Sequence, residues 1–289
     1  MSLSSSKASS PAAQAAKPFL KWVGGKQQLL LQFEQYFPQE DFGRYFEPFL
    51  GGGAIFFHLW TSGKLPKEVF LFDNNDELIN VYTVVRDNLD ALVELLIVHQ
   101  QNHGKDYYYK IRSLDRQDVE LSRIERAART IYLNRTCYNG LYRVNQKKQF
   151  NAPIGSYKNP KVLYKDVLEA ASVALQKVVL ETKDFREIVS LAQPGDFFYF
   201  DPPYDPISKT SSFTGYTAGN FTDVDQRDLA EVFKELHDKG CLCMLSNSRT
   251  SFILELYQNF RIELVNARRA VNSDANGRGS IKEVVVINY

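Results

Sequence analysis

Short runs of apolar and β-branched residues recur along the chain, and most are bounded by Gly, Pro, Asn or Asp, a pattern that predicts strands. The predicted strands are Tyr45–Phe49, Val69–Asp73, Val178–Lys183, Phe197–Asp201, Cys241–Ser246, Ile262–Asn266 and Glu283–Asn288. Apolar residues at helical spacing lie between several of them. The corresponding helices are Gly53–Thr61, Asp76–Asn88 and Asp223–Lys239. This alternation predicts an α/β fold with a doubly wound, mostly parallel sheet. Polar residues without a helix pattern join the last two strands, which we expect to form an antiparallel hairpin at one edge.

The alternation is interrupted between residues 92 and 175. Two helical patterns, Tyr107–Ser113 and Val119–Leu133, are followed by a loop-rich basic region without clear strands. We interpret residues 92–175 as a helical insertion or second domain between the second and third strands. The sheet domain then comprises residues 17–91 and 176–289. Residues 1–16 are rich in Ser, Ala and Pro and lack an apolar core, which predicts a disordered tail and not a signal peptide.

The tetrapeptide Asp201-Pro202-Pro203-Tyr204 follows one of the predicted strands directly. Ligands of open α/β sheets bind outside the carboxyl ends of the strands, so the tetrapeptide lies where chemistry is expected. Two prolines stiffen the turn and remove two backbone donors, which leaves carbonyl groups free to accept. A carboxylate, free carbonyls and an aromatic ring can together hold a base through both hydrogens of its exocyclic amine. The alternative is a rigid turn without a chemical role.

A glycine-rich turn, Phe46 to Gly53, closes the first strand and opens a helix. Glycines there allow backbone amides to approach a ligand closely. Asp73 ends the next strand, where a carboxylate is well placed to accept the ribose hydroxyls of a nucleoside cofactor. A tight structural turn is the alternative for the glycines alone.

The distribution of charge is more informative than the net charge of +1. Between residues 126 and 165 there is no Asp or Glu, and the nine basic residues are Arg126, Arg129, Arg135, Arg143, Lys147, Lys148, Lys158, Lys161 and Lys165. Tyrosines and a phenylalanine are interleaved with them, which suits a phosphate backbone and exposed bases. The alternative is a solvated face whose acidic partners come from elsewhere in the fold.

Composition excludes several classes of protein. Hydrophobic content of 44% and charged content of 24% are ordinary for a globular protein, and no apolar run has the length of a transmembrane helix. Three cysteines are too few and too badly spaced for a disulfide framework, and we expect Cys241 and Cys243 to be buried small hydrophobes. Four scattered histidines form no ligand pattern, so no metal is expected.

A further motif, Lys21-Trp22-Val23-Gly24-Gly25-Lys26, precedes the sheet. It is followed in order by the glycine-rich turn, by Asp73-Asn74-Asn75 and by the tetrapeptide. With these four motifs the chain resembles the DNA adenine N6-methyltransferases of the Dam/DpnII-type group (D12 class) from about Pro18 to Tyr289. The resemblance implies a Rossmann-like sheet that binds S-adenosylmethionine and makes residues 92–175 a DNA target-recognition domain. It also implies methyl transfer to N6 of adenine in duplex DNA, in GATC sites and with base flipping.

The resemblance also implies roles for particular residues. The S-adenosylmethionine pocket would be formed by Trp22, Lys26, Glu47, Pro48, Phe49, Gly51, Asp73, Asp184, Phe185 and Asp201. Among these, Asp73 would bind the ribose, and Asp184 and Phe185 the cofactor adenine. Asp201 and the Pro202 carbonyl would accept the hydrogens of the target amine, and Tyr204 would stack on the flipped base.

The DNA contacts implied in the same way lie mostly in the insertion. Base reading would involve Lys21, Arg135, Tyr138, Asn139, Leu141 and Arg143. Arginine paired with guanine is the commonest specific contact, so Arg143 is the candidate for a guanine. Lys147, Lys148 and Lys158 would contact phosphates.

Two alternatives remain beside a duplex DNA adenine methyltransferase. One is a methyltransferase acting on another amine, such as cytosine N4 or an RNA adenine. The other is a non-catalytic nucleic-acid-binding module on a degenerate methyltransferase fold. Asp before Pro-Pro-Tyr, where Ser would otherwise stand, favours adenine by the resemblance. We expect a cytoplasmic, nucleoid-associated monomer that binds double-stranded DNA, with a cognate restriction endonuclease as a further potential partner.

Overall fold

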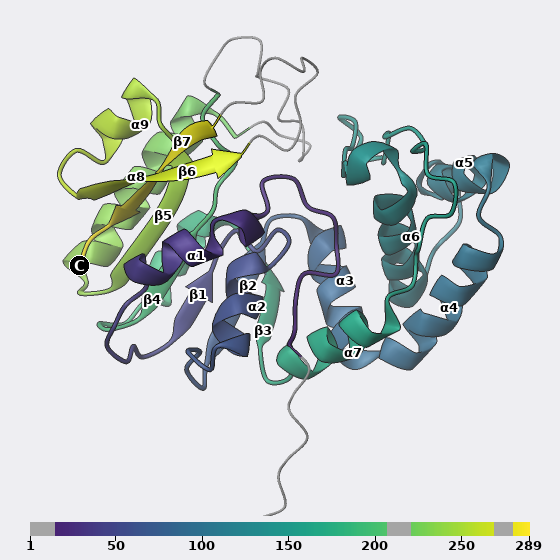
Figure 1. Cartoon of the computed structure of the whole chain (residues 1–289), viewed down its shortest axis with the longest axis horizontal. Helices are drawn as coiled ribbons and strands as arrows, with labels where there is room; N and C mark the ends of the chain where they lie inside the picture. Colours follow the sequence, from purple (N-terminus) through teal and green to yellow (C-terminus); the bar gives the residue numbers. More distant parts are fainter. Residues whose placement is uncertain (1–14, 207–220, 269–279) are drawn as a thin grey trace, which may run out of the picture.

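The computed structural model describes residues 15–206, 221–268 and 280–289. In these ranges seven strands form one sheet in the order β3-β2-β1-β4-β5-β7-β6 (Figure 1). The strands are β1 (Tyr45–Glu47), β2 (Val69–Asp73), β3 (Val179–Thr182), β4 (Phe197–Phe200), β5 (Leu242–Ser248), β6 (Arg261–Arg268) and β7 (Ser280–Ile287). Strands β1 to β5 are parallel, whereas β7 is antiparallel to both β5 and β6. The predicted fold class, all seven strands and the antiparallel edge hairpin are therefore confirmed.

The bounds of the strands differ from the prediction for physical reasons. Strand β1 ends at Glu47 because the next residue, Pro48, has no backbone donor for the ladder. Pairing of β6 with β7 continues as far as Arg268 and Ser280, beyond the apolar residues from which the strands were predicted. Residues 1–14 of the predicted tail and residues 269–279 of the hairpin connection lie outside the described residues. Ala16, which the prediction placed in the tail, is buried.

Helices cover both faces of the sheet. Alternate side chains of β4 point to opposite faces, so Phe198 and Phe200 join one buried cluster while Phe197 and Tyr199 join the other. The first face is covered by η5 (Phe185–Ser190), α8 (Asp223–Asp238) and α9 (Ser251–Leu256). The second is covered by η1 (Lys26–Gln28), α1 (Leu30–Phe33), η2 (Glu34–Tyr36), α2 (Ala54–Thr61) and α3 (Asp76–Asp87).

The insertion between β2 and β3 is helical, as predicted. It contains α4 (Leu89–Gln101), α5 (Lys105–Ser113), η3 (Leu114–Arg116), α6 (Arg123–Thr136), η4 (Tyr138–Gly140) and α7 (Lys165–Ala174). Figure 1 shows α4, α5 and α6 on the opposite side of the molecule from α8 and α9. Helix α6 packs on α3, and one buried cluster runs from Val81 of α3 to Ile131 of α6. The separation of residues 92–175 as a domain stays a prediction.

The order of the strands fixes where a ligand can bind. The order in which strands are added reverses between the parallel strands β1 and β4. The next strand after β1, β2, lies on one side, and the next strand after β4, β5, lies on the other. Crevices form outside the carboxyl ends of the strands at such a switch point. Glu47 ends β1 and Asp201 follows β4, so both carboxylates lie at this position. None of the helices in the described ranges has the length and apolar character needed to cross a membrane.

Candidate active site and cofactor pocket

A cavity of about 920 Å³ lies at the carboxyl ends of the central strands. Its walls come from the segment before the sheet, the glycine-rich turn, the ends of β2 and β3, and the tetrapeptide after β4. All residues expected to bind the cofactor line it: Trp22, Lys26, Glu47, Pro48, Phe49, Gly51, Asp73, Asp184, Phe185 and Asp201. Pro202 and Tyr204 line the same cavity. The structure thus brings together residues that are far apart in the sequence.

The two carboxylate oxygens of Asp201 have different surroundings. The Lys26 ammonium lies 2.6 Å from Oδ1, and the Ser246 hydroxyl donates to the same oxygen at 3.1 Å. Among the described residues, Oδ2 has no hydrogen-bond donor. Burial raises the pKa of Asp201, and the nearby Lys26 opposes that rise. The carboxylate therefore has one oxygen fixed by the protein and one available to a ligand.

Lys26 is itself buried, with only 4% of its surface exposed. Its ammonium donates to the Gly24 carbonyl at 2.7 Å and lies 4.6 Å from the centre of the Tyr204 ring. A buried ammonium needs such partners, because an unpaired buried charge is strongly unfavourable. The resemblance places Lys26 in the cofactor pocket, and the structure in addition pairs it with the carboxylate of the tetrapeptide.

The backbone of the tetrapeptide is held from the other side. Gln226 of α8 donates to the Pro203 carbonyl at 2.9 Å. Asn247 of β5 donates to the Gln226 side chain at 3.1 Å and accepts from the Asp205 amide at 3.1 Å. The neighbouring Pro202 carbonyl receives no hydrogen bond from a described residue. This arrangement fixes the turn while it leaves one carbonyl free.

Asp73 is tied to the glycine-rich turn. Its Oδ2 accepts from the Gly51 amide at 3.0 Å and its Oδ1 from the Asn75 amide at 3.0 Å. Burial raises the pKa of Asp73 to about 6, although these amides favour the charged form. Gly51 has a positive φ of 47°, and a Cβ there would lie 3.0 Å from the Trp22 ring. Only glycine fits this turn without moving the indole.

Glu47 has the most strongly perturbed environment of the cavity carboxyls. It is 2% exposed and accepts from the Tyr45 hydroxyl at 2.8 Å. Burial raises the pKa of Glu47 to about 8, and the nearby Asp201 and Asp73 add to that rise. Glu47 is therefore largely protonated at neutral pH, and its carboxyl group can donate a hydrogen bond as well as accept one.

Three aromatic rings meet at the end of the cavity next to β3. The Phe49 ring centre lies 5.4 Å from that of Phe185 and 5.8 Å from that of Phe221. Asp184 is the N-cap of η5 and accepts from the Arg186 amide at 2.9 Å and from its guanidinium. Rings and a carboxylate are the groups expected around a purine. Phe221 did not emerge from the sequence, because nothing local connects it with Phe49.

A family model of D12 class N6 adenine-specific DNA methyltransferases matches residues 22–271. The chain belongs to this family. M1.LlaDCHI, a type II methyltransferase of Lactococcus lactis subsp. cremoris, is 46% identical over 94% of this chain and 95% of its own length. M.MjaIII, a type II methyltransferase of Methanocaldococcus jannaschii, is 40% identical over 94% of this chain and 99% of its own. The DNA adenine methylase of Escherichia coli (strain K12) is 31% identical over 94% and 95%.

Family membership confirms the predicted enzyme class, a DNA adenine N6-methyltransferase. The two alternatives, another amine substrate and a non-catalytic module, are not retained. No group of three or more His, Cys, Asp or Glu side chains in the described ranges is placed to hold a metal ion. Cys241 and Cys243 are buried and unpaired, as predicted.

Not all nine basic residues between 126 and 165 of this D12-class methyltransferase carry an unpaired charge. Arg126 pairs with Asp76 and Glu77, and Arg129 pairs with Asp115. Lys165 lies 3.6 Å from Glu169. The alternative of acidic partners from elsewhere is thus correct for three of the nine residues. Five have no ion pair with another described residue: Arg143, Lys147, Lys148, Lys158 and Lys161.

Arg135 departs from the expected DNA contact. Its guanidinium donates to the Phe19 carbonyl and lies 4.5 Å from the centre of the Tyr164 ring. Burial lowers the pKa of Arg135. The side chain thus connects α6 with the segment before the sheet. A base contact by Arg135 stays a prediction.

The other predicted base-reading residues lie around the end of α6. Tyr138 and Asn139 are exposed, Leu141 is half-buried, and Asn139 and Lys21 line the cavity. Buried Asn134 accepts from the Lys21 amide at 2.8 Å and donates to the Lys21 carbonyl at 2.7 Å. It also donates to the Gly140 carbonyl at 3.1 Å. One asparagine thus ties the first motif to the loop expected to read bases.

Residues 143–151 form a small hairpin in which Val144 pairs with Phe150. Arg143 is exposed, and its guanidinium donates to the side chain of Asn151 at 2.6 Å. Lys147 and Lys148 lie exposed at the turn. Lys158 is exposed on the following loop. The predicted phosphate contacts are therefore accessible.

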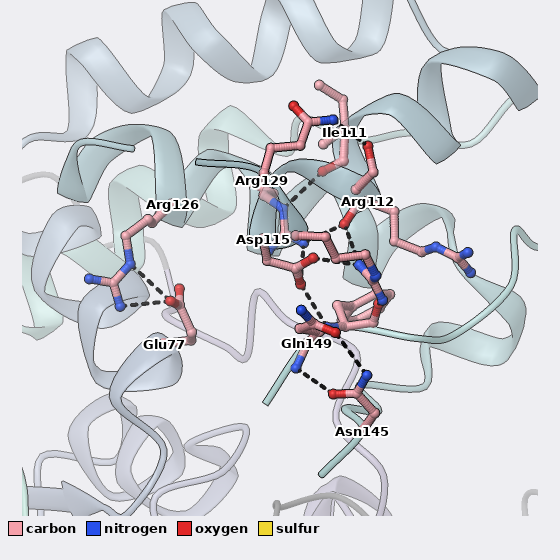
Figure 2. A network of polar contacts seen from close by, with 12 residues as sticks. Glu77, Ile111, Arg112, Asp115, Arg126, Arg129, Asn145 and Gln149 are labelled. Carbon is pink, nitrogen blue, oxygen red and sulfur yellow. Dashed lines mark hydrogen bonds and ion pairs between the residues drawn. The ribbon is translucent and has the colours of Figure 1, made fainter. Parts of the chain in front are cut away.

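An ion pair between buried Arg129 and half-buried Asp115 supports this hairpin (Figure 2). Asp115 pairs with Arg129 at 2.7 Å and accepts from the Phe150 amide at 2.7 Å. Arg129 donates to the carbonyls of Ile111 and Arg112 at 2.9 and 2.8 Å. Asn145 and Gln149 close the turn through a side-chain hydrogen bond of 3.0 Å (Figure 2). These contacts thus anchor the hairpin that carries Lys147 and Lys148 to α5 and α6.

Proposed function

We propose that this enzyme takes its methyl group from S-adenosylmethionine and transfers it to an adenine that has been flipped out of duplex DNA, in GATC sites. The observation that carries the proposal is the pair of free acceptors beside Tyr204. These acceptors are Asp201 Oδ2 and the Pro202 carbonyl, and both groups line the cavity. An exocyclic amine has two hydrogens, which such a pair matches.

The cavity suits the cofactor in size and chemistry. S-adenosylmethionine supplies a methyl group bound to a positively charged sulfur. Buried Asp73 would accept the ribose hydroxyls, while Phe49, Phe185 and Asp184 would hold the adenine. Trp22, Glu47, Pro48, Gly51 and Lys26 would bind the methionine end. Six acidic and four basic side chains line the cavity, so its wall favours a ligand with a positive centre even with Glu47 protonated.

Adenine N6 is a poor nucleophile because its lone pair is delocalised into the ring. Acceptance of both N6 hydrogens by Asp201 and the Pro202 carbonyl would localise that lone pair and stabilise positive charge developing on the nitrogen. Attack on the methyl carbon would break its bond to sulfur and leave a neutral thioether, and the methylated nitrogen would then lose one proton to the Asp201 carboxylate. Lys26 and Ser246 keep the carboxylate in position through its other oxygen. Stacking of the base on Tyr204 would orient the nitrogen toward the methyl donor.

A base inside a duplex cannot reach this cavity, so the target must leave the helix. Flipping costs a few kcal/mol, and stacking on Tyr204 would offset part of that cost. Lys21, Tyr138, Asn139, Leu141 and Arg143 are the proposed base-reading residues. Lys147, Lys148 and Lys158 would contact phosphates and fix the register of the protein on DNA.

Two relatives are named type II methyltransferases, which supports a cognate restriction endonuclease as a partner of this enzyme. A monomer suffices for the chemistry, because one site modifies one base at a time. Protection of DNA from a GATC-cleaving endonuclease after treatment with the enzyme would support both the site and this role.

The direct test supplies radiolabelled S-adenosylmethionine and duplexes that differ only in the GATC site. We expect label on N6 of adenine in the GATC duplex, and none in a duplex with a changed site or with N6 already methylated. Equal labelling of all duplexes would contradict the sequence specificity. Label on cytosine or on RNA would contradict the proposed substrate.

A further inference from the structure

Strand β7 contributes a carboxylate to the wall of the cavity. This residue belongs to none of the sequence motifs. Glu283 pairs in register with Ser248 of β5 and with Val265 of β6. Its side chain lines the cavity, and its Oε2 accepts a hydrogen bond of 2.8 Å from the Tyr204 hydroxyl. The two residues come from elements 79 positions apart in the chain.

Burial raises the pKa of Glu283, and the nearby Lys26 and the Tyr204 hydroxyl oppose that rise. Core packing of β7 is provided by the buried residues that follow, Val284, Val285 and Val286. A half-buried carboxylate in a strand whose core packing comes from its neighbours is not explained by packing, so a function for its hydrogen bond is the better explanation.

The tyrosine hydroxyl needs an explanation as well. Stacking on a base requires only the ring, which a phenylalanine would supply equally well. The ring can still rotate on its loop unless a second point is fixed. Asn247 holds the loop at the Asp205 amide, and Glu283 holds the distal end of the ring. The ring plane is thus set by a rigid strand.

We propose that Glu283 is a positioning residue for the methyl transfer, acting through the Tyr204 hydroxyl. With the ring plane fixed, a flipped adenine would stack with its N6 directed at Asp201 Oδ2 and the Pro202 carbonyl. The inference rests on the proposed function and adds to it a residue that acts through the Tyr204 hydroxyl.

The test is a double-mutant cycle of Glu283→Ala and Tyr204→Phe, with Glu283→Gln as the conservative variant. The matched control is Glu263→Ala, which removes a carboxylate from the neighbouring strand β6, away from the cavity. Single-turnover methyl transfer to a GATC duplex is measured, together with fluorescence of 2-aminopurine at the target position and binding of S-adenosylmethionine by calorimetry. Thermal unfolding of each variant shows whether it is folded.

We expect each single substitution to lower the single-turnover rate about tenfold, as for one hydrogen bond to a charged group. The double variant should be no slower than the slower single variant, because both changes remove the same contact. Glu283→Gln should retain most of the rate, since its amide oxygen still accepts. Fluorescence of the flipped 2-aminopurine should change in Glu283→Ala, while cofactor binding and the control stay as in the wild type.

Additive losses in the double variant, or a wild-type rate in Glu283→Ala, would overturn the role of Glu283. Should Glu283→Ala fail to fold, Tyr204→Phe leaves the carboxylate in place and removes the same hydrogen bond, so a wild-type rate there is equally decisive. Failure of the proposed function appears differently, as absence of adenine methylation by the wild-type enzyme itself.

Discussion

The two carboxylate oxygens of Asp201 differ in their surroundings, and only one of them is held by the protein. Lys26 and Ser246 both contact Oδ1, and Oδ2 has no donor among the described residues. Burial favours the neutral acid, and the Lys26 ammonium favours the carboxylate that the chemistry requires. A residue remote in sequence therefore favours the charged form of this carboxyl group.

Substitution of Asp201 by Ala should abolish methyl transfer and leave duplex binding largely intact. The acceptor for the target amine is lost, whereas the basic surface that binds phosphates is unchanged. Single-turnover labelling and a gel-shift titration with a GATC duplex measure the two effects separately. Equal loss of binding and turnover would show that Asp201 serves the structure of the site and not the reaction.

The raised pKa of Glu47 should be visible in the pH dependence of the free energy of unfolding. Its pKa is raised by burial from an unperturbed 4.5 to about 8, so the folded protein holds the proton more tightly than the unfolded chain. The free energy of unfolding should therefore fall as pH rises from about 4.5 to about 8, by up to several kcal/mol from this group.

Glu47→Gln removes this proton linkage. We expect the variant to gain stability relative to the wild type above about pH 8, with no such gain below about pH 4.5. Thermal unfolding of both proteins without cofactor across this range measures the difference. A parallel dependence in the two proteins would mean that another group is responsible.

The residues proposed to read DNA lie on a hairpin and a loop that contacts with neighbouring helices hold in place. The hairpin of residues 143–151 is anchored through Asp115 and Arg129 to α5 and α6, and Asn134 ties the loop before it to Lys21. Trp22 stacks on Tyr142 with ring centres 5.3 Å apart. The loop proposed to read bases and the proposed cofactor pocket thus share their supports.

Arg143→Ala should relax discrimination at the position of one guanine in the site, by about 1–3 kcal/mol. Rates of methylation of GATC and of singly substituted sites are compared for the variant and for Lys110→Ala, which removes an exposed cation on α5. Unchanged discrimination at every position in Arg143→Ala would refute the assignment.

Helices and strands were predictable from the sequence wherever apolar residues form a clear run or recur at a regular spacing. All seven strands were identified from apolar runs, and α6 could have been bounded better from its capping box, in which Ser122 and Glu125 bond reciprocally. Helices α4 and α7 were not assigned, although Leu92, Val93 and Leu96 of α4 are buried at helical spacing. Neither helix has a side-chain hydrogen bond at its N-cap, so the start signal that marks α6 is weak there.

Residues of the site were predictable only where they belong to contiguous motifs. The contacts of Lys26, Ser246 and Glu283 arise from strand order and register, which no local pattern encodes. The contacts of Arg135 with the Phe19 carbonyl and the Tyr164 ring were not predictable either, because they join segments far apart in the sequence. The polar residues Ser246 and Glu283, at the ends of apolar runs, were the available signal.

For the whole molecule, function depends on where charge lies and not on its sum. The chain carries a net charge of only +1, yet Arg143, Lys147, Lys148, Lys158 and Lys161 lack an ion pair with any described residue. Neutralisation of phosphates by such cations releases counterions and makes binding dependent on salt.

The double substitution Lys147→Ala/Lys148→Ala should weaken binding to all duplexes alike and lower the slope of log affinity against log salt by about 2. The slope is measured by titration of a duplex at several salt concentrations. The control, Lys234→Ala, removes an exposed cation on α8, outside the insertion. A specific loss for GATC duplexes alone would instead assign the two lysines to base reading.

The measurement that bears most directly on the central claim is a crystal structure of the enzyme with a non-reactive analogue of S-adenosylmethionine and a GATC duplex. We predict an extrahelical adenine stacked on Tyr204, with its N6 about 3 Å from both Asp201 Oδ2 and the Pro202 carbonyl oxygen. An adenine still stacked in the duplex, or an N6 beyond hydrogen-bond distance of both acceptors with the cofactor analogue in place, would contradict the account.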